Sequence, residues 1–137
     1  MSNESDIRHG RHCVFKLHVH LVFVAKYRRR VFDARAIDLL RGIFAEVCSG
    51  AQATLVEMDG EDDYVHLLVE YPHKVAVSSL VNGLTGVSSR LLRQQRPDIR
   101  KRYRKGVLWS PSYFASSCGG APISIVRQYI EQQKTPA

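Results

Sequence analysis

Hydrophobic and polar positions alternate along the first patterned stretch of the chain, residues 13–25 (CVFKLHVHLVFVA). Its odd-numbered positions are all apolar, whereas its even-numbered positions mix Lys16, His18 and His20 with valines. A period of two residues is typical of a strand with one buried face. We therefore expect one face of this strand in the core and a half-polar opposite face, which is suited to border a functional site.

Two longer stretches repeat apolar residues every three or four positions, the period of a helix with one buried side. The first follows Asp33, a favourable N-cap residue, and ends near Ser49 and Gly50. The second spans residues 78–95. The residues expected in the core are Ile37, Leu40, Ile43, Phe44 and Val47 from the first helix, and Leu80, Val81, Leu84, Val87, Leu91 and Leu92 from the second.

Three further strands are predicted. Residues 51–58 and 64–71 flank the acidic turn 59–63 and predict a hairpin. Residues 107–117 predict a strand that Pro111 breaks. The order β-α-β-β-α-β indicates an α+β fold, an antiparallel sheet with helices packed on one face, in a ferredoxin-like or RRM-like arrangement. At an exposed edge, the long first strand would also be able to pair with its copy in a second subunit.

The C-terminal segment predicts a flexible joint followed by a short helix. Gly119 and Gly120 free the backbone from the usual φ limits, and Pro122 suits a first helical turn. At about 100° per residue, Tyr129 and Gln133 lie side by side at the edge of the apolar stripe of this helix. A tyrosine there can present its hydroxyl to a cleft while the helix stays docked.

Length and composition indicate one soluble domain, residues 1–137, in which the polar residues 1–10 form a flexible tail. The net charge is +7 and favours polyanionic partners, with nucleic acid ahead of an anionic membrane. No apolar run approaches the roughly 18 residues that span a bilayer. Because the N-terminus also lacks a signal-peptide core, we expect a cytoplasmic protein without a membrane partner.

The positive charge is concentrated in two runs. The first is Lys26-Tyr27-Arg28-Arg29-Arg30, and the second extends from Arg90 to Lys105, where eight cations face one acid, Asp98. Cations also suit the C-terminal end of a helix, so part of the second run acts as capping. Tyr27 and Tyr103 lie among these cations and are placed to stack on unpaired bases. The predicted DNA-contacting residues are Lys26, Tyr27, Arg28, Arg29, Arg30, Arg90 and Arg93.

Four runs, in this order, resemble a known family: HVHLVFVAKYRRRVF, DGEDDYVHLLVEYP, LVNGLTGVSSRLLR and LWSPSYFASSCGGAPISIVRQYIEQQ. The family is that of the single-tyrosine HUH transposases of small bacterial insertion sequences, the TnpA or IS200-like type. The resemblance covers residues 10–133, and its most specific motifs are the GGAP joint, the QYIxxQ helix and the DxVH strand. It implies a homodimer with composite active sites that recognises the element ends as single-stranded DNA hairpins, cuts them and rejoins them. It implies no small-molecule substrate.

Residue by residue, the resemblance implies that Tyr129 attacks the scissile phosphate and forms a 5′-phosphotyrosine. The joint at Gly119 and Gly120 would act as a hinge for the tyrosine helix. A divalent metal, Mg²⁺ or Mn²⁺, would be bound by His66 and Gln133. A free phenol titrates near pKa 10, so the attacking tyrosine must lose its proton during the reaction. The covalent step conserves the energy of the broken bond, so no ATP site is expected.

The sequence departs from the family at the first histidine of the HUH strand, where it has Tyr64. A neutral phenol is a poor ligand for Mg²⁺ or Mn²⁺, and only a phenolate with a strongly lowered pKa would replace the imidazole. Three explanations compete: a natural or engineered knockout, a weaker metal site completed by water or Asp63, and a rearranged site that recruits His18 or His20.

Three functions therefore remain open. The first is a DNA transposase, active or impaired at Tyr64, and the second is a catalytically inactive hairpin-binding protein of the same fold. The third is a ferredoxin-like RNA-binding module, which fits the order of elements and the charge. That module lacks the paired aromatic residues expected on the central strands, and it leaves Tyr129 and Gln133 unexplained.

Overall fold

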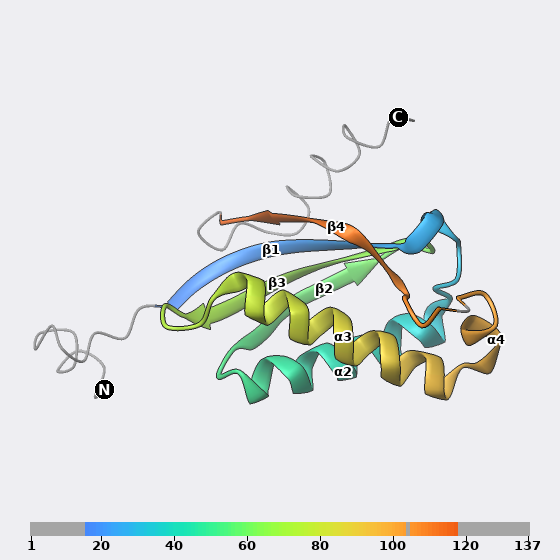
Figure 1. The fold of residues 1–137 in the computed structure, drawn as a ribbon. Coiled ribbons are helices and arrows are strands. Elements are labelled where there is room, and N and C mark those ends of the chain that lie inside the picture. Colours follow the sequence, from blue (N-terminus) through green and yellow to red (C-terminus); the bar gives the residue numbers. More distant parts are fainter. Residues whose placement is uncertain (1–15, 104, 118–137) are drawn as a thin grey trace, which may run out of the picture.

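The computed structural model describes residues 16–103 and 105–117. The predictions for the N-terminal tail, the glycine joint and the tyrosine helix lie outside these residues. Figure 1 shows helices α2 and α3 side by side along one face of a four-stranded sheet. In chain order the elements are β1 (Lys16–Ala25), the 3-10 turn η1 (Lys26–Arg28), α2 (Ala34–Gly50), β2 (Thr54–Gly60), β3 (Tyr64–Pro72), α3 (Val77–Gln95), α4 (Pro97–Arg100) and β4 (Trp109–Ser116).

The strands have the order β2-β3-β1-β4, and every neighbouring pair is antiparallel. The predicted α+β fold, an antiparallel sheet with helices packed on it, is therefore confirmed, as is the β2–β3 hairpin. The expectation that β1 could pair with its own copy along a free edge is wrong for residues 20–25. β1 lies between β3 and β4, and β4 pairs with it from His20 to Ala25. The edges among the described residues are β2 and β4.

The odd-numbered positions of β1 lie on the sheet face that packs against the helices, as their pattern predicts. Val19, Leu21 and Phe23 are buried against the apolar stripes of α2 and α3. The ring of Phe23 lies 6.0 Å from that of Phe44 and 5.7 Å from that of Trp109. Leu17, near the start of the strand, is the exception and is 39% exposed. Among the described residues, no helix is long and apolar enough to cross a membrane.

The N-cap of α2 also joins two distant parts of the chain. Oδ1 of Asp33 accepts a hydrogen bond from the backbone N–H of Ala36 at 2.8 Å, which confirms the predicted cap. The guanidinium of Arg96 donates to both carboxylate oxygens of Asp33 and to both of Asp98, at 2.8 to 2.9 Å. These bonds to Arg96 are the main reason that the pKa of Asp33 falls to about 2. The start of α2 is therefore held beside α4.

Pro111 does not break the fourth strand but produces a bulge in it. Ala25 pairs with Trp109 and Phe23 pairs with Tyr113, so β4 has two more residues than β1 between these pairs. An edge strand tolerates a proline at such a bulge because no neighbouring strand needs a hydrogen bond from the N–H that proline lacks. The indole N–H of Trp109 donates to Oγ of Ser88 at 2.9 Å, which fixes the start of β4 on α3.

Candidate nucleic-acid interface and catalytic face

The sheet face turned away from α2 and α3 has the half-polar character predicted from β1. Because side chains alternate along a strand, His18 and His20 share this face with Tyr64 and His66 of β3. His20 and His66 are fully buried, and Tyr64 is 2% exposed. Tyr64 also packs with Val22 in a small apolar cluster on this face. The residues that the resemblance assigns to the HUH strand therefore lie in a dry environment.

His66 has the chemistry of a metal ligand. Among the described residues, neither of its ring nitrogens has a hydrogen-bond partner. Burial lowers the pKa of His66 below its ordinary value, and the nearby His20 lowers it further by electrostatic repulsion. The neutral imidazole that results is the form that binds metals. The ring of Tyr64 stacks on that of His66, with centroids 5.9 Å apart and an interplanar angle of 27°.

The donor set that the structure describes does not complete a metal site. Within residues 16–103 and 105–117, no three side chains of the His, Cys, Asp and Glu type are grouped so that they could hold an ion. His66 fits a divalent metal, but Tyr64, where the resemblance implies an imidazole, has a phenol that is a poor ligand when neutral. Tyr129, Gln133, Gly119 and Gly120 lie outside the described residues.

The structure distinguishes the three side chains that were expected as substitutes for an imidazole at position 64. His18 lies 3.3 Å from the carboxylate of Glu70, and Asp63 is paired with Arg28 at 3.2 Å. His20 faces Leu68 across the β1–β3 ladder, one diagonal step from His66 on the same face. Of the three candidates, His20 is therefore the one that lies beside His66.

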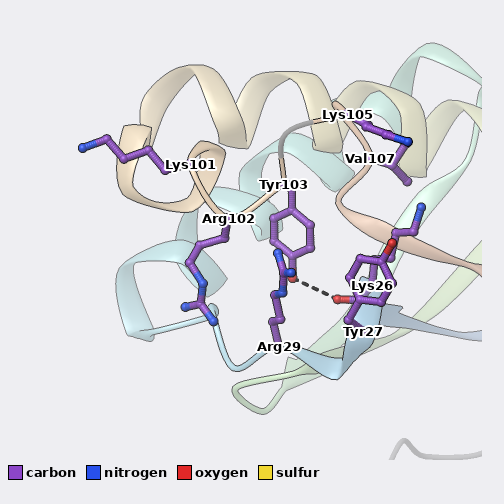
Figure 2. Close-up of a pocket in the computed structure, with 8 residues that line it drawn as sticks. All are labelled: Lys26, Tyr27, Arg29, Lys101, Arg102, Tyr103, Lys105 and Val107. Carbon is purple, nitrogen blue, oxygen red and sulfur yellow. Dashed lines mark hydrogen bonds between the residues drawn. The ribbon is translucent and has the colours of Figure 1, made fainter.

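The two cationic runs, far apart in the sequence, meet in one pocket of about 550 Å³. Figure 2 shows η1 and the segment after it on one side, and the segment between α4 and β4 on the other. The pocket is lined by Lys26, Tyr27, Arg29, Lys101, Arg102, Tyr103, Lys105 and Val107. Among the described residues, its lining contains five cations and no acid, so it is suited to a polyanion.

Two tyrosines hold the central cation of this pocket. The guanidinium carbon of Arg29 lies 5.0 Å from the ring centre of Tyr27 and 5.1 Å from that of Tyr103. Tyr103 is almost fully buried, and its hydroxyl donates to the backbone carbonyl of Lys26 at 3.3 Å, the dashed line in Figure 2. Burial raises the pKa of Tyr103, although Arg29 and Arg102 oppose this, so the hydroxyl keeps its proton. Arg29 is thus oriented by cation–π contacts.

The other predicted DNA-contacting residues do not line this pocket. Arg28 is paired with Asp63 at 3.2 Å, and Arg30 lies 3.8 Å from Asp62. Arg90 is exposed on α3. Arg93 borders a separate cavity of about 370 Å³ between α3 and β4.

Sequence reasoning identified the second run but not its contributing members, Lys101, Arg102 and Lys105. Tyr103, already singled out in this run as Tyr27 was in the first, marks their position.

A family model described as "Transposase IS200 like" matches residues 13–133. The chain therefore belongs to the IS200-like transposase family, whose activity is the transposition of mobile DNA elements. It is 31% identical over 134 residues to the transposase for insertion sequence element IS200 of Salmonella typhimurium, covering 97% of this chain and 85% of the relative. It is 28% identical over 128 residues to the ISDra2 transposase TnpA of Deinococcus radiodurans, covering 93% and 91%.

Two solved structures share the fold. A crystal structure of a Deinococcus radiodurans R1 protein assigned as a transposase has a TM-score of 0.75 and 30% identity, covering 90% of this chain and 95% of that one. The REP-associated tyrosine transposase, solved bound to a REP hairpin, has a TM-score of 0.56 and 11% identity, covering 86% of this chain and 65% of that one. The second likeness concerns the fold alone.

Proposed function

We propose that this chain cleaves and rejoins single-stranded DNA at the ends of an insertion sequence through a 5′-phosphotyrosine on Tyr129, and that it recognises those ends as hairpins. The observation that carries the proposal is the family match over residues 13–133, which includes both the strand with His66 and the segment with Tyr129. A protein of the same fold was solved with a hairpin, which makes hairpins the first substrates to test.

The proposed chemistry assigns one task to each residue. Tyr129 supplies the oxygen that attacks the scissile phosphate and releases a 3′-hydroxyl; attack by that hydroxyl on the phosphotyrosine rejoins the strand. His66 and Gln133 would hold Mg²⁺ or Mn²⁺, which when bound stabilises the charge that develops on the phosphate. His66 fits this role because it is buried, neutral and without a described hydrogen-bond partner. Gly119 and Gly120 would form the hinge of the tyrosine helix.

The presence of Tyr64 favours a lowered rate of DNA cleavage. It also favours a second function, hairpin binding without cleavage. With a phenol stacked on His66 where the family has an imidazole, the metal would lack one ligand. In the extreme case the protein binds hairpins without cutting them. The basic pocket and the net charge of +7 support DNA binding in either case.

The test is incubation of the protein with hairpin-flanked single-stranded DNA and Mg²⁺ or Mn²⁺, followed by a denaturing gel. A covalent protein–DNA band that requires the metal is expected. We also expect the hairpin to bind more tightly than a duplex of the same sequence, with log K falling by about 0.7 per log unit of salt for each phosphate contacted. Hairpin binding without a covalent band would identify the non-catalytic protein, and equal affinity for duplex would contradict hairpin recognition.

We also propose a homodimer with composite sites, in which the tyrosine helix of one subunit meets the HUH strand of the other. The small size of the domain supports this, since one copy offers little surface for both a hairpin and a complete site. Light scattering at micromolar concentration is expected to give twice the mass of one chain, about 31 kDa against 15.5 kDa. The mass of a single chain would contradict the composite site.

A further inference from the structure

The pocket between η1 and the segment that joins α4 to β4 has the features of a site for one nucleotide. We propose that it binds a single unpaired nucleotide of the DNA strand, with the base stacked on Tyr27 and the phosphate held by Arg29 and the surrounding lysines. This inference rests on the proposed function for its choice of DNA as the ligand, and it adds a specific subsite for the strand.

The charge of the lining selects an anion. Lys26 and Arg29 come from one side of the pocket, and Lys101, Arg102 and Lys105 come from the other. In Figure 2 the side chain of Lys101 extends away from the two tyrosine rings, so it belongs to the rim, whereas Arg29 lies against Tyr103 at the centre. The cavity of about 550 Å³ lies within the size range of small-molecule sites and suits one nucleotide rather than a base pair.

Tyr27 supplies a surface for the base. Tyr27 is the most exposed large hydrophobic residue that the structure describes, with 72% of its surface accessible to solvent. The cations Lys26 and Arg29 lie over its ring at 5.4 and 5.0 Å. A base offers its π-face to an aromatic ring only when it is not stacked within a duplex. The pocket is therefore expected to select single-stranded over duplex DNA.

The backbone at Tyr27 is strained in a way that exposes the ring. Tyr27 has φ 63° and Arg28 has φ 53°, two consecutive non-glycine residues in the left-handed region. Such conformations persist only where the surroundings impose them, and they are concentrated at functional sites. Here the ion pair between Arg28 and Asp63 and the hydrogen bond from the N–H of Lys26 to the carbonyl of Leu108 hold the turn from both sides.

Arg29 is prepared for the phosphate before any ligand arrives. Its guanidinium is in contact with Tyr103, a buried ring whose hydroxyl is tied to the backbone of Lys26. A guanidinium positioned in this way needs little ordering to bind a phosphate. Arg41 differs, because its guanidinium is paired with Asp38 on α2 at 2.8 Å, outside the pocket. The chain thus offers a matched control in an arginine that has no assigned role in DNA binding.

The experiment measures binding of a short, unstructured, fluorescently labelled oligodeoxynucleotide by anisotropy over a range of salt concentrations. The full chain is compared with Tyr27→Leu, Tyr27→Phe, Arg29→Gln and the control Arg41→Gln. Tyr27→Leu is expected to weaken binding by about 5- to 150-fold, the range for loss of one stacked base, with an unchanged salt slope. Tyr27→Phe keeps the ring and should bind as the parent does. Arg29→Gln should weaken binding and reduce the salt slope by about 0.7, whereas Arg41→Gln should do neither.

A second readout locates the base. One abasic nucleotide is moved along the oligodeoxynucleotide after its register has been fixed by a flanking hairpin, and one position is expected to lose affinity with the parent chain but not with Tyr27→Leu. Thermal unfolding checks that each variant is folded. Arg29 lies outside the strained turn of Tyr27 and Arg28, so the Arg29→Gln result does not depend on that turn being preserved. Equal binding by Tyr27→Leu, Arg29→Gln and Arg41→Gln would overturn the inference, as would parent protein that does not bind the oligodeoxynucleotide.

The outcomes also separate this inference from the proposed function. Hairpin cleavage by a protein whose Tyr27→Leu and Arg29→Gln variants bind like the control would reject the pocket and keep the transposase chemistry. Weakened binding by these two variants, in a protein that never forms a covalent adduct, would keep the pocket and reject the chemistry.

Discussion

Tyr64→His is expected to increase strand cleavage by at least about 10- to 100-fold and to tighten the binding of Mn²⁺ by a similar factor. Loss of a group that merely orients a metal ligand typically costs this much, so gaining a direct imidazole ligand should give no less. The position is already suitable, because residue 64 lies on the same face as His66 and its ring stacks on that of His66. The substitution replaces a phenol by a smaller ring that accepts a metal through nitrogen.

Isothermal titration calorimetry with Mn²⁺ measures the affinity, and single-turnover cleavage of a hairpin-flanked strand measures the rate. Tyr64→Phe is the matched control, because it keeps the stacked ring and removes only the hydroxyl; it should give no gain in either measurement. If the parent chain already binds Mn²⁺ tightly and Tyr64→His adds nothing, another residue completes the site. His20→Ala would then be the next variant, since His20 lies diagonally across from His66.

Tyr129→Phe, in the Tyr64→His background, is expected to abolish the covalent protein–DNA adduct while leaving the affinity for hairpin DNA unchanged. In the proposed mechanism the substitution removes only the oxygen that attacks the phosphate, and it keeps the aromatic ring and the net charge of the chain. The expected effect is loss of all detectable adduct, larger than that of any binding variant.

The adduct is measured on a denaturing gel, and affinity is measured by anisotropy on the same hairpin. Tyr113→Phe serves as a control for removal of a tyrosine hydroxyl elsewhere, because Tyr113 lies on β4 and is partly exposed. It should leave the adduct intact. An adduct that survives Tyr129→Phe would mean that a different residue is the nucleophile.

The periodicity of the chain was sufficient to predict the four strands and the two long helices that the structure describes, but not η1 or α4. The alternation in β1 identified the positions that enter the core, and Asp33 marked the start of α2 because only that residue could cap the first turn. The strands that pair with β1 could not be predicted in the same way. Which strands flank β1 depends on how β4 returns across the sheet, a long-range pairing that leaves no local signal in the sequence.

The site divides along the same line. His66 and Tyr64 could be placed on one face from their spacing, since residues two positions apart in a strand point the same way. The basic pocket could not be predicted, because its two halves are more than 70 residues apart and are joined only by folding. The sequence also carried no sign of the ion pairs of Arg28 with Asp63 and of Arg30 with Asp62. The adjacent cations were therefore treated alike, although they have different partners in the structure.

Asp63 connects the turn beside the basic pocket to the strand that bears His66. Its carboxylate binds Arg28 in the strained turn, its carbonyl accepts the N–H of Ala25, and the next residue in the chain is Tyr64. The turn that exposes Tyr27 and the strand that bears His66 are thereby fastened together at one residue. A strand gripped at the pocket would therefore reach His66 at a constant number of nucleotides from the grip. Loosening Asp63, for example by Asp63→Asn, would then blur the position of the cut rather than only slow it.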